Sequence, residues 1–384
     1  MLGFFTIYLL LYGGLHLHFF LKVQSVFQLH GLVLLPLVLW LVVMFLAPMV
    51  VWRLESIGLH SLVKPFAFIG YSWMGFLFLF FCISVSLDIA QLLLKWAAVL
   101  FSFVPPVLLA SAKNYFLASF IAALAAAGWG IVAARTIHVE RIVMKFPNVP
   151  AAADGYRIVQ ISDIHLGVMT SRTWLDEVIA TVNGLKPDLI VATGDIVDSH
   201  VNGSREYAAT MRRLQARDGK YAIPGNHEQY AGIERAMHFF REAGFVPLRD
   251  DLAQPQPWLT VAGVDDRDRH NAAAQARPDQ ELPLLQRARE HGGWVLLLKH
   301  QPVVNATSLG LFDLQLSGHV HQGQIYPFRY LTHLIYPVLS GLNAMDKGSY
   351  LYVNRGTGTW GPPMRVLAPP EITLIELRHA DTGG

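Results

Sequence analysis

The 384-residue sequence predicts membrane-spanning helices at residues 1–135, a connector at residues 136–154 and an α/β domain at residues 155–380. Two observations lead to this prediction. Residues 1–135 are poor in charge and rich in Leu, Phe, Val and Ala, whereas the later residues hold nearly all of the Asp and Glu. In the later part, short apolar strand patterns alternate with helical patterns. The net charge of +2 is too small to indicate a nucleic-acid partner.

The N-terminal part contains five apolar runs, most of them long enough to cross a hydrocarbon core of roughly 30 Å. The fourth run is preceded by Lys95 and interrupted by Pro105 and Pro106, so four spans are the alternative to five. The first run is not a cleavable signal peptide, because it lacks a basic start and further spans follow it. The runs cover residues 2–21, 29–52, 65–87, 96–110 and 115–134.

The basic residues near the ends of these runs bear on the orientation in the membrane. With five spans, the bias weakly places the C-terminal domain in the cytoplasm, and removing one span reverses it. Cys82 is the only cysteine, so no disulfide pair can indicate the compartment. One side carries Lys22, Lys95, Arg135, Arg141 and Lys145, and the other carries Arg53, Lys64 and Lys113.

The C-terminal domain is predicted from alternating elements. The later part of the domain is richer in strands, which suggests a second sheet packed against the first. Helices are expected at residues 172–185, 204–216 and 232–243. Strands are expected at residues 156–162, 188–193, 220–223, 258–264, 294–299, 314–316, 350–354 and 372–377.

Five short blocks of metal-ligand residues occur in this domain, and four of them directly follow an expected strand. Because sites in α/β sheets lie beyond the carboxyl ends of strands, the blocks should converge at one sheet edge. Oxygen and nitrogen ligands without thiolates suit two divalent ions such as Mn, Fe or Zn, and such ion pairs activate water against phosphate esters. The blocks are Asp163-Ile164-His165, Gly194-Asp195 with Asp198, Gly225-Asn226-His227-Glu228, His300 and Gly318-His319-Val320-His321.

The order D-x-H, G-D-x-x-D, G-N-H-E, H, G-H-x-H resembles the calcineurin-like metallophosphoesterase superfamily over about residues 155–378. Residues 155–158, 322–328, 355–358, 363–365 and 371–372 are similar to its bacterial membrane-associated branch. The resemblance implies a four-layer α/β/β/α sandwich in a multi-pass protein of the bacterial inner membrane. It also implies hydrolysis of phosphomonoesters or phosphodiesters by metal-activated water. Gln322, where many relatives carry Gly, is a departure that concerns substrate fit.

Residue by residue, the resemblance implies a two-metal site. Asp195 would bridge the two ions, and His227 would protonate the leaving oxygen while Asp198 orients it. Arg355 and Arg365 are hypothetical phosphate clamps, although a surface ion pair is an equal alternative for each. The first ion would be bound by Asp163, His165 and His321, and the second by Asn226, His300 and His319.

Several functions fit these features. The leading hypothesis is a membrane-anchored phosphoesterase whose partners are the lipid bilayer and a phosphate ester, with lipid-linked esters as one candidate substrate. A sugar-nucleotide lipid pyrophosphatase of envelope lipid synthesis is the runner-up in the same class. In a different class, the spans would act as a transporter or sensor and the C-terminal domain would be non-catalytic. The spans show no internal repeat and few ionisable residues, which disfavours a transporter.

Overall fold

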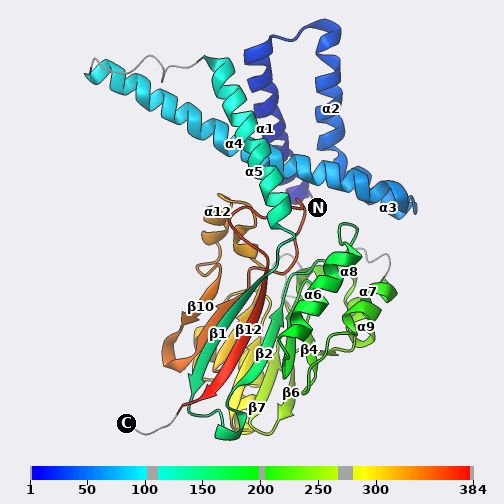
Figure 1. Cartoon of the computed structure of the whole chain (residues 1–384), viewed down its shortest axis with the longest axis vertical. Coiled ribbons are helices and arrows are strands. Elements are labelled where there is room, and N and C mark those ends of the chain that lie inside the picture. The colour runs from blue at the N-terminus through cyan, green and yellow to red at the C-terminus, as the bar shows by residue number, and fades with distance from the viewer. Residues whose placement is uncertain (1, 102–110, 199–203, 267–279, 381–384) are drawn as a thin grey trace. The chain divides into compact units, whose positions relative to one another are not determined.

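The computed structural model describes residues 2–101, 111–198, 204–266 and 280–380. The chain forms two compact units (Figure 1). The helical unit comprises residues 1–133 and 361–366, and the sandwich unit comprises residues 134–360 and 367–384.

The helical unit contains two helices that are long and apolar enough to cross a membrane, counted over the described residues. They are α4 and α5, and a third span is obtained if the pair α2 and α3, bent by 57°, is one broken span. The helices of this unit are α1 (Leu2–Phe27), α2 (Leu35–Phe45), α3 (Ala47–Ser56), α4 (His60–Phe101) and α5 (Ala112–Ala133).

The expected break between the third and fourth apolar runs is wrong, because α4 continues without interruption through Lys95 to Phe101. The rest of the fourth run, residues 102–110, lies outside the described residues. Within this helix, Asp88 accepts a hydrogen bond from Lys22 Nζ of α1 at 2.6 Å. This charged residue of α4 therefore takes part in a contact between two helices.

The sandwich unit contains two six-stranded sheets. In the first sheet β2, β3, β4 and β5 are parallel, and β12 lies antiparallel to β2. In order, the first sheet is β1 (His138–Phe146), β12 (Glu371–His379), β2 (Tyr156–Ile161), β3 (Leu189–Thr193), β4 (Lys220–Ile223) and β5 (Val246–Pro247). The second is β10 (Gly341–Ala344), β11 (Tyr350–Val353), β9 (Leu314–Ser317), β8 (Trp294–Leu298), β7 (Leu259–Gly263) and β6 (Asp251–Gln256).

The core between the sheets is built from alternate side chains of buried strands. In β3, Leu189 and Val191 belong to the core that includes residues of both sheets, whereas Ile190 and Ala192 pack with the outer helices. This alternation is the period of two that a strand buried on both faces requires. Helices α6 (Arg172–Gly184), α7 (Ser204–Met211) and α9 (Ile233–Glu242) cover the first sheet (Figure 1), and α11 (Glu281–Glu290) packs against the second. The predicted α/β/β/α sandwich is confirmed.

The expected strands are all present with boundaries shifted by a few residues, but the connector expected at residues 136–154 contains β1. This strand pairs in parallel with β12 from His138 opposite Glu371 to Phe146 opposite His379. Its Glu140, Arg141 and Lys145 are typical of a charged edge strand, which protects a sheet edge from further pairing. Because of these charged residues, the sequence lacks the apolar pattern by which the other strands were recognised.

Candidate metal centre

The candidate ligands in the loops after β2, β3 and β9 have unusual backbone conformations. Asp163 and Asp195 both have φ of 51° and His319 has φ of 71°, a left-handed conformation that side-chain-bearing residues rarely adopt. A Cβ atom on Gly318 would lie 2.2 Å from Asp163 Oδ2, and one on Gly225 would lie 2.2 Å from Asp195 Oδ1. Glycine is required at both positions because the neighbouring backbone approaches the carboxylates so closely.

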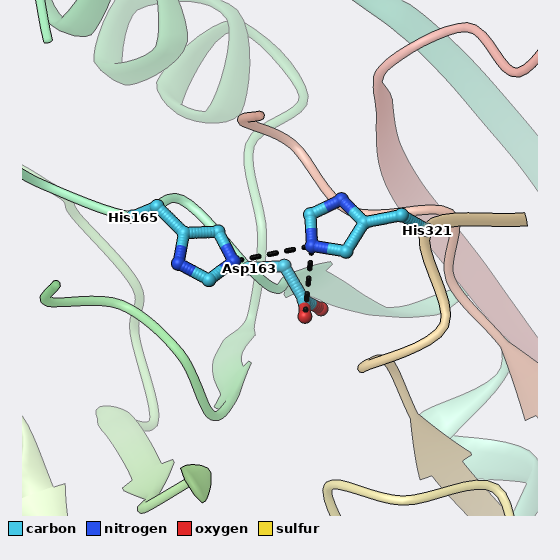
Figure 2. A group of neighbouring side chains, drawn as sticks. All are labelled: Asp163, His165 and His321. Carbon is cyan, nitrogen blue, oxygen red and sulfur yellow. Dashed lines mark hydrogen bonds and ion pairs between the residues drawn. The ribbon is translucent and has the colours of Figure 1, made fainter. Parts of the chain in front are cut away.

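Three of the candidate ligands form a first group, shown in Figure 2: Asp163, His165 and His321. His165 Nε2 lies 3.1 Å from His321 Nε2, which is 3.4 Å from Asp163 Oδ1. All three side chains are buried, and Asp163 is completely so. The Asp163 carboxylate accepts hydrogen bonds from Ser162 Oγ and from the His319 backbone N–H at 3.0 Å, which fixes its orientation.

A second group contains Asp195, His300 and His319, with Asn226 beside them. His300 Nε2 lies 3.2 Å from Asp195 Oδ2, 3.2 Å from Asn226 Oδ1 and 3.1 Å from His319 Nδ1. Asp195 Oδ2 is also 4.0 Å from His165 Nε2 of the first group. One carboxylate therefore stands between the two groups, in the place where a bridging ligand would lie.

The second nitrogen of each ring in the second group is held by the protein. His300 Nδ1 donates to the Thr193 carbonyl at 2.7 Å, so its Nε2 presents a lone pair when the ring is neutral. His319 Nε2 donates to the Tyr336 hydroxyl at 3.1 Å, and that hydroxyl donates to Gln301 Oε1 at 2.9 Å. Hydrogen bonds of this kind orient imidazoles for a metal ion.

This arrangement fits two divalent cations. Within each group one ligand atom per residue lies within 4.8 Å of the others. Two imidazole nitrogens facing each other at 3.1 Å need either a proton on one ring or a shared cation. Burial, together with repulsion from Asp195, raises the pKa of Asp163 to about 6 although His300 opposes the shift. A bound cation would offset this crowding of buried carboxylates.

His227 lies beside these groups without belonging to the seven expected ligands. Its Nδ1 is 2.8 Å from Asp198 Oδ1, as the resemblance implies, and its backbone N–H donates to Asp195 Oδ1 at 2.9 Å. Burial disfavours the charged ring, but the Asp198 hydrogen bond and the nearby carboxylates outweigh it and raise the pKa of His227 to about 8. In the metal-free chain the ring therefore favours the protonated form, which is the form that a general acid needs.

Two aromatic residues that the sequence analysis did not select stand at the edge of this site. The rings of Tyr230 and Trp360 have centroids 5.5 and 5.6 Å from that of His227, and each residue is more than half exposed. The amide of Gln324 holds the Trp360 backbone by donating to its carbonyl at 2.8 Å and accepting from its N–H at 3.0 Å. The two rings therefore lie beside His227 and are partly open to solvent.

Glu228 has a structural role that the sequence analysis did not assign. Its fully buried carboxylate accepts hydrogen bonds from four backbone N–H groups, at distances of 2.7 to 2.9 Å. The donors are Asp195, Ile196 and Val197 after β3, and Gly225 after β4. Glu228 therefore ties together the two loops that carry Asp195 and Asn226. The sequence pattern that could have indicated this role is Gly225 followed three positions later by Glu228, where Gly225 immediately precedes the short helix α8 (Asn226–Ala231).

The two arginines expected to clamp phosphate are engaged elsewhere. Arg355 Nη2 lies 2.5 Å from Glu140 Oε1 of β1, and its Nε lies 2.8 Å from Glu371 Oε2 of β12. Arg355 therefore links these two strands. Arg365 is completely buried and belongs to the helical unit, where its backbone N–H donates to the Gly130 carbonyl at 2.9 Å. Arg355 thus forms an ion pair, and Arg365 is buried in the helical unit, so neither is included in the proposed site.

The fold and the two groups of ligands define a sandwich-type metal-dependent hydrolase. Residues 156–323 match the calcineurin-like phosphoesterase family. An uncharacterized metallophosphoesterase of Aquifex aeolicus is 33% identical over 243 residues, which are 63% of this chain and 92% of the relative. The uncharacterized metallophosphoesterase YkuE of Bacillus subtilis is 34% identical over 290 residues, 70% of this chain and 98% of the relative.

The chain belongs to the calcineurin-like metallophosphoesterase family and is a metal-dependent phosphoester hydrolase. A transmembrane protein with metallophosphoesterase domain from Danio rerio is 32% identical over 281 residues, 70% of this chain and 64% of that protein. This similarity, together with the apolar helices α4 and α5, indicates membrane association.

Proposed function

We propose that the chain is a membrane-anchored phosphoesterase that uses two divalent cations to hydrolyse phosphomonoesters or phosphodiesters. The observation that carries the proposal is the position of Asp195, which lies within reach of both ligand groups. Asp163, His165 and His321 would hold one cation, and Asn226, His300 and His319 the other. Two bound cations would polarise the phosphoryl oxygens and lower the pKa of the attacking water.

The protein side chains would perform the proton transfer and the positioning. His227, hydrogen-bonded to Asp198, would give a proton to the leaving oxygen. Asp198 would keep the ring in place through Nδ1, leaving Nε2 to donate the proton. Tyr230 and Trp360 would pack against the leaving group beside that nitrogen. Glu228 would hold the loops of Asp195 and Asn226 at a fixed separation.

The proposal predicts that Asp195→Asn abolishes hydrolysis, since a neutral amide cannot serve two cations. In the full chain in detergent with Mn²⁺, kcat/KM for bis(p-nitrophenyl) phosphate and p-nitrophenyl phosphate should fall by about a thousandfold, which is the order expected when the shared charge of a metal centre is lost. Bound metal, measured by elemental analysis, should fall with it.

Asp176→Asn is the matched control, because Asp176 forms an exposed ion pair with Arg213 away from the ligand groups. It should keep both the activity and the bound metal of the parent chain. The proposal is wrong if Asp195→Asn and Asp176→Asn hydrolyse the esters at the same rate. Comparing Mn²⁺, Fe²⁺ and Zn²⁺ in the parent chain would identify the metals that support the reaction.

A further inference from the structure

A segment of the sandwich unit, residues 326–335, exposes an unusual number of large apolar side chains. It surrounds the short helix α12 (Arg329–His333). Leu334 is 81% exposed, Ile335 65% and Tyr330 60%. Monomeric soluble domains rarely leave so many apolar residues together on their surface, and such a patch usually marks a surface that contacts a membrane or another protein. The exposed apolar residues of the segment are Tyr326, Phe328, Tyr330, Leu331, Leu334 and Ile335.

The charge around this segment favours a negatively charged partner. No Asp or Glu occurs between Asp313 and Asp346, although the chain contains 28 acidic residues. Arg329 and His333 lie within the segment itself. Tyr and Phe next to basic residues form the combination that settles at the interface of an anionic bilayer, where the rings enter the headgroup region and the cations contact phosphate.

The segment is continuous with the metal centre. Tyr336, the residue that follows it, accepts a hydrogen bond from His319 Nε2 at 3.1 Å and donates one to Gln301 at 2.9 Å. At its other end, Gln324 holds the backbone of Trp360, whose ring lies 5.6 Å from that of His227. Whatever the segment contacts is therefore brought close to the candidate ligands.

We propose that residues 326–335 form a membrane-docking element that enters the interface of an anionic bilayer. A bilayer is available to this chain because α4 and α5 are long and apolar enough to cross one. Docking would bring phosphate esters at the lipid surface to the metal centre, and this second step rests on the function proposed above. The alternative occupants are a second copy of the chain and another part of the same chain.

The docking itself is tested with a fluorescent probe in the full chain. In a Cys82→Ser background, which removes the only native thiol, Leu334→Cys would be labelled with an environment-sensitive dye. The labelled chain is placed in vesicles of equal parts phosphatidylcholine and phosphatidylglycerol that carry a doxyl-labelled lipid as quencher. Ala180→Cys on α6, also exposed, is the control position.

If the segment docks, the doxyl lipid should quench the dye at position 334 at least twice as strongly as the dye at position 180. The reason is that the apolar side chains around position 334 would enter the acyl boundary, where the quencher lies. Equal quenching at the two positions would overturn the proposal. A blue-shifted dye at position 334 without lipid quenching would also overturn it, because the segment would then be covered by protein.

The delivery of substrate is tested with Leu331→Ser, Leu334→Ser and Ile335→Ser combined. The rate on phosphatidic acid in the same vesicles should fall by about tenfold, the size expected when several buried apolar groups are lost from a membrane contact. The rate on soluble p-nitrophenyl phosphate should stay unchanged. An unchanged vesicle rate would overturn delivery. A parent chain that hydrolyses neither ester would contradict the proposed function, while the quenching experiment would still decide the docking.

Discussion

The two ligand groups differ in how the protein holds their histidines. In the second group His300 Nδ1 donates to a backbone carbonyl and His319 Nε2 donates to Tyr336. In the first group the Nδ1 atom of His165 is buried and has no hydrogen-bond partner among the described residues. The second group is thus oriented by the surrounding protein, whereas the orientation of His165 depends on what its Nε2 contacts.

The two positions of a two-metal site can therefore differ in how far the protein orients their ligands before a cation binds. Rings with a fixed tautomer lose little freedom when a cation binds, so the affinity of the second group should be higher. In the first group, the ring of His165 would gain much of its order from the cation itself.

The strongest effect is expected from Glu228→Gln, which removes part of the support of the second group. An amide NH₂ would face two of the four backbone N–H donors now bound by the carboxylate. Leaving two buried donors without an acceptor should cost about 2–4 kcal/mol of stability, which lowers the thermal midpoint of the sandwich unit by roughly 5–10 °C.

Circular dichroism of the full chain in detergent would measure this midpoint. Glu234→Gln is the matched control, since Glu234 has a side chain 85% exposed on α9 and should leave the midpoint unchanged. Equal midpoints for the two variants would show that Glu228 does not stabilise the loops, and the preorganisation of the second group would need another source.

A smaller effect is expected in the order of metal binding. When Mn²⁺ is added to the metal-free chain, the second group should fill first, with an affinity about 10- to 100-fold higher than that of the first group. Calorimetric titration should resolve two steps. His321→Asn should retain the tight step and lose the weak one, whereas His300→Asn should lose the tight step. Two steps of equal affinity would contradict the expected difference between the two groups. So would a tight step that is lost in His321→Asn and retained in His300→Asn.

The smallest effect is expected from Tyr336→Phe, which removes the hydroxyl that accepts from His319 Nε2. The tight step should weaken by about tenfold, the lower end of the effect of such supporting contacts, while the weak step should not change. Tyr221→Phe, a change to a half-buried tyrosine of β4, provides the comparison in the same titration. If both steps weaken equally in Tyr336→Phe, the hydroxyl does not act through His319 alone.

The strands and ligand blocks of the sandwich were predictable because their signals are local. Buried apolar stretches of four to six residues mark β2, β3 and β4, and the ligands follow each strand directly. Parallel strands of the first sheet then place the loops of Asp163, Asp195 and Asn226 at one edge. His319 follows β9 of the second sheet, so only the packing of the two sheets brings it beside Asp163. The grouping of Asp163, His165 and His321 was implied by the resemblance to the family, and these three side chains lie together in the structure.

The contacts made by distant partners were not predictable from the sequence. The sequence left a phosphate clamp and a surface ion pair as equal alternatives for Arg355, because Glu140, its ion-pair partner, lies 215 positions away in an edge strand that the sequence did not indicate. Asp88 inside α4 accepts a hydrogen bond from Lys22 of α1, a contact between helices that the sequence did not indicate. The four donors to Glu228 come from loops on two strands, and only the folded chain brings them to one carboxylate.

The left-handed backbone at the ligand positions has a consequence for local stability. Asp163, His165, Asp195, His319 and His321 all have positive φ angles, between 46° and 71°. Each such residue carries a conformational cost of about 1–2 kcal/mol that its surroundings must offset. The ligand loops should therefore open before the strands beneath them do, and amide hydrogens there should exchange with solvent fastest after a chelator has removed the cations. The ligand loops, which bound cations would hold rigid during turnover, would thus be the first part of the sandwich unit to open in the metal-free chain.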